Sequence, residues 1–185
     1  MAETATLDLK PATLAKIESL FPKYPDKRSL TLPLCHLVQE DLGYLSDDAI
    51  EWIAAKLDQE PIQVLEVVSF YPMYRRKPIG KVHVKVCRTL SCALVGAYKT
   101  CEKLEETLGC KRGHTSADGN YSIEFVECIA KCGMGPLVQV DDKLYEKCKP
   151  EELDGLIEAI KAAAAEGPEP TDHPKPQPGT PAYEG

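Results

Sequence analysis

The first 75 residues carry apolar side chains at the spacing of amphipathic helices. Pro11 stands near the start of the first apolar stripe, where its missing N–H does no harm. Gly43 follows the second stripe and suits the C′ position that ends a helix. The stripes comprise Leu14, Ile17 and Phe21; Leu34, Leu37, Val38 and Leu42; Ile50, Ile53, Ala54 and Leu57; and Val64, Val67, Val68 and Tyr71. The pattern therefore predicts a helical bundle.

Local signals mark where the third and fourth of these helices begin and end. Ser46 is a good N-cap, and Asp47 and Asp48 place negative charge in the first turn after it. Pro61 opens the fourth helix. Pro72 should end it, because the residue before a proline avoids the helical region.

From residue 81 onward the hydrophobic period alternates between that of strands and that of helices. Lys81–Val86 and Tyr121–Glu127 each alternate apolar and polar positions, which predicts two strands. Between them a helical stripe runs from Leu94 to Leu108 and stops at Gly109. A strand, a helix and a second strand in this order predict a parallel pair of strands.

The remaining apolar segments predict a hairpin and a last helix. Leu137–Val140 and Leu144–Tyr145 flank Asp141 and Asp142, which is a hairpin signal. A final helix is expected from Pro150, with Leu153, Leu156, Ile157 and Ile160 directed inward. The predicted order β-α-β-β-α is that of a small α/β sandwich of the thioredoxin type.

These patterns divide the chain into four parts. We expect a helical bundle over residues 1–75, a linker over 76–80 and a thioredoxin-like domain over 81–164. Residues 165–185 are rich in proline and lack periodicity, so we expect a disordered tail there. The fold class is thus α/β (α+β), with the helical bundle preceding the thioredoxin-like domain.

Four of the eight cysteines form two closely spaced pairs. Cys87 and Cys92 have four residues between them, and Cys128 and Cys132 have three. Each pair directly follows a predicted strand, and neighbouring strand ends can hold two short loops face to face. Four thiolates that converge in this way are the ligand set of a 2Fe-2S cluster.

The spacing of the four cysteines favours some roles over others but does not exclude every alternative. A structural zinc site prefers Cys-x2-Cys knuckles or mixtures of Cys and His, and a thioredoxin dithiol also requires Cys-x-x-Cys. Neither spacing occurs, and the plant-type ferredoxin pattern stops because position 95 is Val. Iron–sulfur ligation is therefore favoured, with zinc and unliganded or redox thiols left as alternatives.

The remaining candidate groups are interpreted as structural. Cys35 and Cys101 lie on or beside apolar helix stripes, whereas Cys110 and Cys148 stand near element ends and are expected to be more exposed. Trp52 is expected to pack, although partly exposed. His36, His83, His114 and His173 form no spaced set of metal ligands, and Arg88 and Lys131, inside the two cysteine loops, are interpreted as solvated surface charges.

Composition narrows the range of partners. A net charge of −7 argues against nucleic acid, which requires a basic face. No apolar run approaches the roughly 18–20 residues that span a bilayer, so no direct membrane insertion is expected. The N-terminus lacks the features of a secretory signal. We therefore expect a cytoplasmic protein, or one held on the cytoplasmic side of the inner membrane through a complex.

With these residues in place, the chain resembles a known family, the thioredoxin-like 2Fe-2S subunit of the NADH-dehydrogenase module of respiratory complex I. The resemblance covers roughly residues 10–163. It is carried by Gly43-Tyr44-Leu45-Ser46, Phe70-Tyr71-Pro72-Met73-Tyr74, Gly80-Lys81, Val86-Cys87-x4-Cys92, Gly96, Asp118-Gly119, Glu127-Cys128-x3-Cys132-Gly133 and Pro136. The chain departs from the family pattern at Ala130 and Lys131, at Tyr74 where the family's Phe-Tyr-x-Met-Phe segment ends in Phe, and at Gly135. A cation at Lys131 would favour a reduced cluster.

The resemblance implies a function that the spacing alone does not give. It implies one 2Fe-2S cluster held by Cys87, Cys92, Cys128 and Cys132, with no catalytic residue and no complete active site on this chain alone. It also implies a partner that binds FMN and NADH, further iron–sulfur subunits of the peripheral arm, and transfer of single electrons to and from the FMN. The complete assembly would be an enzyme, an NADH:quinone oxidoreductase.

Two other functions remain open on the sequence alone. Similar subunits occur as the diaphorase component of NAD(P)-reducing hydrogenases and of formate dehydrogenases. A structural zinc protein or a cluster-free adaptor would use the same scaffold without electron transfer.

Overall fold

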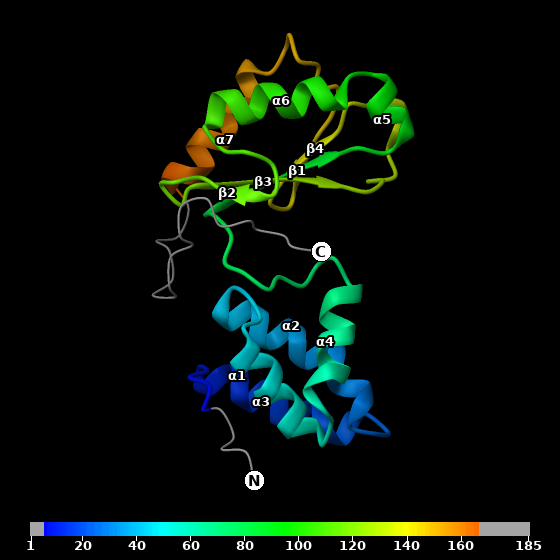
Figure 1. Cartoon of the computed structure of the whole chain (residues 1–185), viewed down its shortest axis with the longest axis vertical. Coiled ribbons are helices and arrows are strands. Elements are labelled where there is room, and N and C mark those ends of the chain that lie inside the picture. Colours follow the sequence, from blue (N-terminus) through cyan, green and yellow to red (C-terminus); the bar gives the residue numbers. More distant parts are fainter. Residues whose placement is uncertain (1–5, 167–185) are drawn as a thin grey trace. The chain divides into compact units, whose positions relative to one another are not determined.

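The computed structural model describes residues 6–166, and these form two compact units (Figure 1). The boundary falls between Pro78 and Ile79. We call residues 6–78 the helical unit and residues 79–166 the sheet unit. Each unit buries its own cluster of apolar side chains. The expected proline-rich tail lies outside the described residues from position 167 onward.

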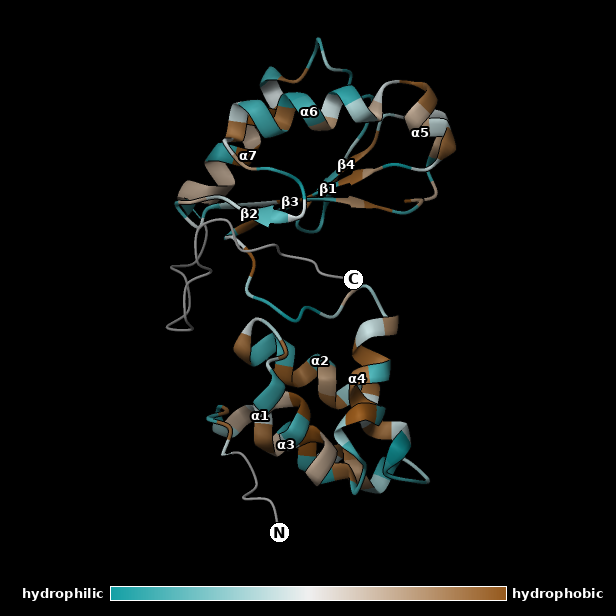
Figure 2. Ribbon diagram, in the orientation of Figure 1, coloured by the Kyte–Doolittle hydropathy of each residue, from teal (hydrophilic) through white to brown (hydrophobic). Residues whose placement is uncertain are grey.

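The helical unit consists of the four predicted helices, which are confirmed with small shifts at their ends. They are α1 (Pro11–Leu20), α2 (Thr31–Leu42), α3 (Asp47–Leu57) and α4 (Pro61–Phe70), with short 3₁₀ turns at Phe21–Lys23 and Arg28–Leu30. Figure 2 shows apolar and polar residues sharing each helix, as amphipathic helices require. In the described residues no helix is both long and apolar enough to cross a bilayer.

The predicted caps at Gly43 and Ser46 are confirmed, and the structure adds a capping box at the start of α4. Gly43 ends α2 in the left-handed region, at a φ of 83°. The Ser46 hydroxyl accepts a hydrogen bond of 3.1 Å from the Ala49 N–H at the start of α3. At the start of α4, the Glu60 N–H donates to the Gln63 side chain over 3.0 Å, which completes a capping box.

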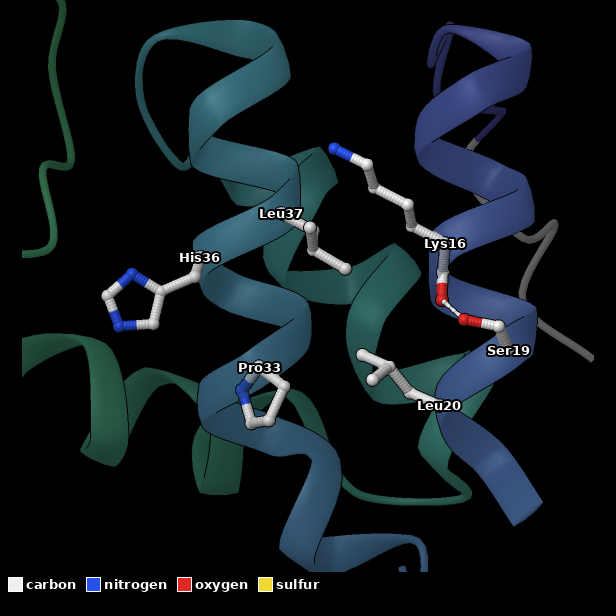
Figure 3. Close-up of a pocket in the computed structure, with 6 residues that line it drawn as sticks. All are labelled: Lys16, Ser19, Leu20, Pro33, His36 and Leu37. Carbon is white, nitrogen blue, oxygen red and sulfur yellow. Dashed lines mark hydrogen bonds between the residues drawn. The ribbon is translucent and has the colours of Figure 1, made fainter. Parts of the chain in front are cut away.

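A shallow groove of about 320 Å³ lies between α1 and α2 (Figure 3). Leu20 and Leu37 point into the space between the two helices, whereas the His36 ring points away from it. The lining residues are Lys16, Ser19, Leu20, Pro33, His36 and Leu37. The groove lies in the helical unit and contains none of the cysteine pairs.

The sheet unit contains a mixed sheet with strand order β2-β3-β1-β4-β5. Its central strand β1 runs parallel to β3, as predicted, and antiparallel to β4. The elements are β1 (Val82–Cys87), α5 (Leu90–Leu94), α6 (Ala97–Leu108), β2 (His114–Thr115), β3 (Tyr121–Val126), a 3₁₀ turn (Cys132–Met134), β4 (Val138–Val140), β5 (Lys143–Tyr145) and α7 (Asp154–Glu166).

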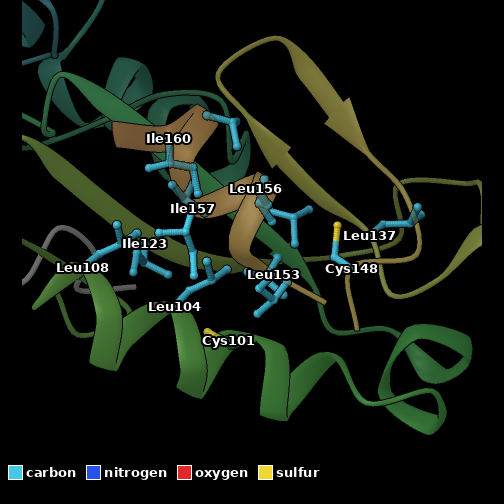
Figure 4. Packing of buried hydrophobic residues seen from close by; sticks show 14 of the residues in the cluster. Cys101, Leu104, Leu108, Ile123, Leu137, Cys148, Leu153, Leu156, Ile157 and Ile160 are labelled. Atoms are coloured by element: carbon cyan, nitrogen blue, oxygen red, sulfur yellow. The ribbon is translucent and has the colours of Figure 1, made fainter. Parts of the chain in front are cut away.

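Helices α6 and α7 supply most of the core that covers the sheet. Figure 4 shows Leu104 and Leu108 of α6 meeting Ile157 of α7 around Ile123 of β3. Leu104 and Ile160 are fully buried. This core fixes the strands, and the strands in turn fix the loops that leave them.

Two helix boundaries differ from the predictions. The helix expected from Leu94 is broken at Gly96, whose φ of 104° lies in the left-handed region, so a short α5 precedes α6. The last helix begins at Asp154 rather than Pro150, because Pro150 occupies a turn in which the Glu152 N–H donates to the Lys149 carbonyl over 2.9 Å. The two-residue strand β2 was not predicted.

Candidate metal centre

The parallel pairing of β1 and β3 brings the two cysteine loops to one edge of the sheet. Cys87, the last residue of β1, lies opposite Val126, the last residue of β3. The second loop continues from Val126, so Cys128 leaves the same edge two residues later. Cys92 faces inward from α5, and Cys132 opens the 3₁₀ turn that follows β3.

The four thiols differ in exposure, and two of them lie close together. All four are free; Cys87 and Cys92 are buried, whereas Cys128 and Cys132 are exposed. The sulfur atoms of Cys128 and Cys132 are 3.7 Å apart. Two thiolates on one tetrahedral metal, with metal–sulfur bonds of about 2.3 Å, lie about 3.8 Å apart. The exposed pair therefore has the separation required to share one metal atom.

A mononuclear site would require the four sulfurs to meet at one point. Within residues 6–166 no three His, Cys, Asp or Glu side chains are placed to hold a single ion. A binuclear cluster needs two ligands on each metal atom, and the close pair of Cys128 and Cys132 matches that requirement for one of them.

Backbone N–H groups point at three of the four sulfurs. The Ala130 N–H donates to Cys128 Sγ over 3.3 Å. Burial raises the pKa of Cys87, but donation from the Ile129 and Thr89 N–H groups outweighs it and leaves that pKa below its ordinary value. Because Ile129 belongs to the second loop, this contact also joins the two loops.

The pKa of Cys92 is shifted in the opposite direction from that of Cys87. Its pKa is raised, first by burial and then by the hydrogen bond with Cys87 and the charges of Cys87 and Cys132, although the Leu137 N–H donates to it. If these cysteines held iron, they would bind it as thiolates, and the same N–H groups would stabilise the negative charge on their sulfurs.

Each cysteine loop carries one cation, and both cations are paired. Arg88 Nη2 and Nε donate to Glu127 Oε1 over 2.7 and 3.0 Å, which ties the first loop to the residue before Cys128. Lys131 forms an ion pair with Glu146, fifteen residues further along the chain. Both cations are exposed, as expected for surface charges, but neither acts as an isolated charge.

Gly135 is packed directly against the centre. A Cβ atom at this position would lie 3.2 Å from Cys92 Sγ and 3.1 Å from Val95 Cγ2. Both distances are shorter than ordinary van der Waals contact, so a larger residue would push on Cys92. The departure of this chain from the family pattern at position 135 therefore lies against a predicted ligand.

The other four cysteines are all buried, which confirms the expectation for Cys35 and Cys101 and corrects it for Cys110 and Cys148. Burial raises the pKa of Cys35 to about 12 and those of Cys101 and Cys148 to about 11. Cys110 is buried in the core of the sheet unit, where its thiol lies 3.3 Å from the His114 carbonyl oxygen and 3.5 Å from the Tyr121 carbonyl oxygen. Such thiols behave as small apolar groups.

The other expected structural residues also fall outside the centre. Trp52 is buried rather than partly exposed, because α3 places it in the core of the helical unit. His83 is buried in β1 and lies 2.8 Å from the Glu124 carboxylate of β3. His173 lies outside the described residues.

Comparison with known proteins identifies relatives along most of the chain. Residues 17–161 match the model of the thioredoxin-like [2Fe-2S] ferredoxin family. The chain is 35% identical over 148 residues to an NADH-quinone oxidoreductase subunit of Rhizobium meliloti, covering 80% of this chain and 88% of that protein. It is 38% identical over 149 residues to NADH-quinone oxidoreductase subunit 2 of Thermus thermophilus, covering 79% and 82%. These matches confirm the resemblance found in the sequence.

A solved structure extends the comparison to the fold. The chain is similar to an NAD+-reducing [NiFe]-hydrogenase in the H2-reduced state, with a TM-score of 0.56 and 16% sequence identity. The match covers 84% of this chain and 23% of the hydrogenase chain. At that identity the likeness concerns the fold alone.

Proposed function

Because this chain belongs to the thioredoxin-like [2Fe-2S] ferredoxin family and has subunits of NADH-quinone oxidoreductases as relatives, we propose that it is the electron-carrying subunit of such a complex. In this proposal Cys87, Cys92, Cys128 and Cys132 hold one 2Fe-2S cluster. Such a cluster, when bound, takes up and returns one electron at a time. The partner is the subunit that binds NADH and FMN, and its FMN is the group with which electrons are exchanged.

The proposal rests mainly on the two pairs of cysteines that follow the carboxyl ends of strands β1 and β3. The 3.7 Å separation of Cys128 and Cys132 suits two ligands of one iron. Cys87 and Cys92, on the other loop, would hold the second iron. Zinc would instead need all four sulfurs at one point.

The remaining residues of the centre have electrostatic roles in the proposal. The N–H groups of Ile129, Thr89 and Leu137 donate to Cys87 and Cys92, which lowers the cost of negative charge on those sulfurs. Glu127 and Glu146 neutralise the two loop cations, so Lys131 contributes less to the potential than an unpaired cation would.

The proposal also extends to the assembly. We expect this chain to bind the peripheral arm, beside the NADH- and FMN-binding subunit and other iron–sulfur subunits, and to reach the cytoplasmic side of a membrane only through them. Its likeness to the hydrogenase supports the fold alone, so the subunits that co-purify with this chain would identify the type of complex.

A cysteine-to-serine pair tests the ligand assignment. Cys128→Ser should abolish or shift the electron paramagnetic resonance signal of the dithionite-reduced protein, because a hydroxyl replaces a thiolate ligand. Cys110→Ser is the matched control, since its thiol already lies 3.3 Å from the His114 carbonyl that a hydroxyl could donate to. An unchanged signal in Cys128→Ser would show that this residue is not a ligand.

Electron exchange with the partner is tested by a second measurement. The full chain is purified together with the FMN-binding subunit and mixed anaerobically with NADH at a controlled potential. A reduced-cluster signal that follows the NADH potential supports exchange through the flavin. If dithionite reduces the cluster but no NADH potential does so, the exchange is wrong while the cluster assignment stands.

A further inference from the structure

A buried hydroxyl of α6 forms a hydrogen bond with a segment far along the chain. Thr100 is fully buried, and its Oγ1–H donates to the Cys148 carbonyl over 2.6 Å. A threonine inside a helix often bonds to a carbonyl of its own helix, as Thr107 does to the Lys103 carbonyl over 2.7 Å. Thr100 instead joins α6 to the segment between β5 and α7. Within that segment, we call residues 146–148 the strap.

The strap is hydrogen-bonded in turn to the backbone at the end of the second cysteine loop. The Cys148 N–H donates to the Pro136 carbonyl over 2.9 Å, and the Lys147 N–H donates to the Met134 carbonyl over 2.8 Å. Met134 belongs to the 3₁₀ turn that Cys132 opens. Two neighbouring N–H groups of the strap therefore hold the backbone that follows one of the proposed ligands.

The peptide unit that joins Pro136 to Leu137 connects the strap to another proposed ligand. Its carbonyl accepts the Cys148 N–H, and its own N–H, which is that of Leu137, donates to the Cys92 thiol. Figure 4 shows Leu137 and Cys148 next to one another in the core of the sheet unit. Because a peptide unit is planar, a hydrogen bond to its carbonyl also sets the direction of its N–H. The strap thus orients a donor to Cys92.

The conformation of the strap requires contacts that hold it in place. Lys147 adopts a left-handed φ of 54°. That conformation costs free energy for a residue with a side chain, because its Cβ atom crowds the following carbonyl oxygen. It persists only where the surrounding structure holds it. The bond from Thr100 to the carbonyl of the next residue, Cys148, is one of the contacts that can do so.

We propose that Thr100 is a positioning residue for the 2Fe-2S cluster, and that it acts through the strap rather than by touching the cluster. The inference rests on the proposed function, because it requires Cys92 and Cys132 to be ligands. The Thr100 hydroxyl fixes the strap, and the strap orients the N–H of Leu137. That N–H stabilises negative charge on Cys92, while the other strap contact holds the turn of Cys132.

Thr100→Val in the full chain tests the proposal, because valine is similar in size and lacks the hydroxyl donor. The rate of cluster loss to an iron chelator and the midpoint potential of the cluster are measured anaerobically. Cluster loss should be about tenfold faster, because a loosened strap lets the second cysteine loop open. The potential should fall, because weaker N–H donation stabilises the reduced cluster less. Thr100→Ser keeps the hydroxyl and should restore both quantities toward those of the wild type.

Thr115→Val is the matched control for the loss of a buried hydroxyl. Thr115 is buried in β2, and its hydroxyl shares a hydrogen bond of 2.8 Å with that of Ser122. Ser122 lies near the start of β3, at the other end of that strand from the second cysteine loop. This variant should keep the wild-type rate of cluster loss and the wild-type potential. Equal changes in both valine variants, or no change in Thr100→Val, would overturn the proposal.

Hydrogen exchange of the wild-type chain tests the strap without a variant that could fail to fold. The N–H groups of Lys147 and Cys148 should exchange at least about a hundredfold more slowly than those of an unfolded peptide, because both are hydrogen-bonded. An iron-loaded chain in which they exchange as fast as unprotected N–H groups would overturn this inference alone. A wild-type chain without iron would overturn the proposed function and the inference with it.

Discussion

At the scale of single residues, the centre depends on groups that the cysteine spacing does not reveal. Lys131 stands between two proposed ligands, and a lone cation there would favour the reduced cluster. The structure pairs it with Glu146, which follows β5. The sequence could predict the cation but not its partner, because the fourteen residues between them include a hairpin whose exact path sets the contact.

This pair predicts two opposite shifts of the reduction potential. Glu146→Gln leaves the Lys131 cation unpaired, so the midpoint potential should rise by on the order of tens of millivolts. Lys131→Met leaves the carboxylate unpaired, and the potential should fall. Redox titration followed by electron paramagnetic resonance measures both, and shifts of the same sign would contradict the electrostatic explanation.

Gly80 is a position where the absence of a Cβ atom is important for packing. A Cβ there would lie 2.6 Å from the Tyr121 carbonyl carbon, which is backbone and cannot move aside. Gly80→Ala should therefore lower the free energy of unfolding by roughly 2–3 kcal/mol. Gly155→Ala is the control, because no atom lies within 4 Å and alanine favours α7 by up to about 1 kcal/mol. Urea unfolding compares the two, and equal stabilities would show that the β1–β3 contact relaxes freely.

At the scale of elements, the hydrophobic period predicted most helices and strands. Where a boundary differs from the prediction, the backbone conformation of a particular residue explains the difference. The stripe from Leu94 to Leu108 is continuous in sequence, yet Gly96 adopts a left-handed φ and separates α5 from α6. That break allows Cys92 to face the core while Leu94 faces solvent. The hydrophobic period alone cannot predict this break between α5 and α6, since glycine also occurs inside helices.

A contact between two helices fixes the start of α1 against α2. The buried Asp41 carboxylate accepts the Lys10 backbone N–H over 2.8 Å and lies 2.9 Å from Lys10 Nζ. Burial raises the pKa of Asp41, but the hydrogen bonds and charge of Lys10 outweigh it, so the pKa lies below its ordinary value. Because the folded pKa is the lower one, this contribution to stability is present above the unfolded pKa of about 3.9 and is lost as the pH falls further.

Asp41→Asn should therefore destabilise the helical unit at neutral pH by roughly 2 kcal/mol. The difference from the wild type should shrink as the pH falls below about 4, because the Asp41 carboxylate of the unfolded wild type is protonated there while that of the folded protein resists protonation down to its own, lower pKa. Urea unfolding at pH 7 and near pH 3 measures this, with Glu51→Gln on the exposed face of α3 as the control. A difference that grows toward acid pH would contradict the sign of the shift.

At the scale of the whole molecule, the sequence predicted the cysteine loops at neighbouring strand ends, and the structure shows β1 and β3 parallel and in register there. It did not predict that Cys110 and Cys148 are buried. Cys110 and Cys148 stand near element ends in the sequence, but both are buried in the core of the sheet unit. Burial depends on how distant segments pack, and a one-dimensional pattern does not contain that information.

The two units have separate cores, and we propose them as separate domains. All four proposed ligands belong to the sheet unit, so we assign the redox role to that unit.

The most direct measurement is an anaerobic analysis of iron, sulfide and zinc in the purified full chain, with an electron paramagnetic resonance spectrum after dithionite reduction. We predict about two irons and two sulfides per chain and a rhombic spin-one-half signal on reduction. Stoichiometric zinc, no sulfide and no signal would contradict the cluster assignment and leave a structural module on a thioredoxin-like scaffold.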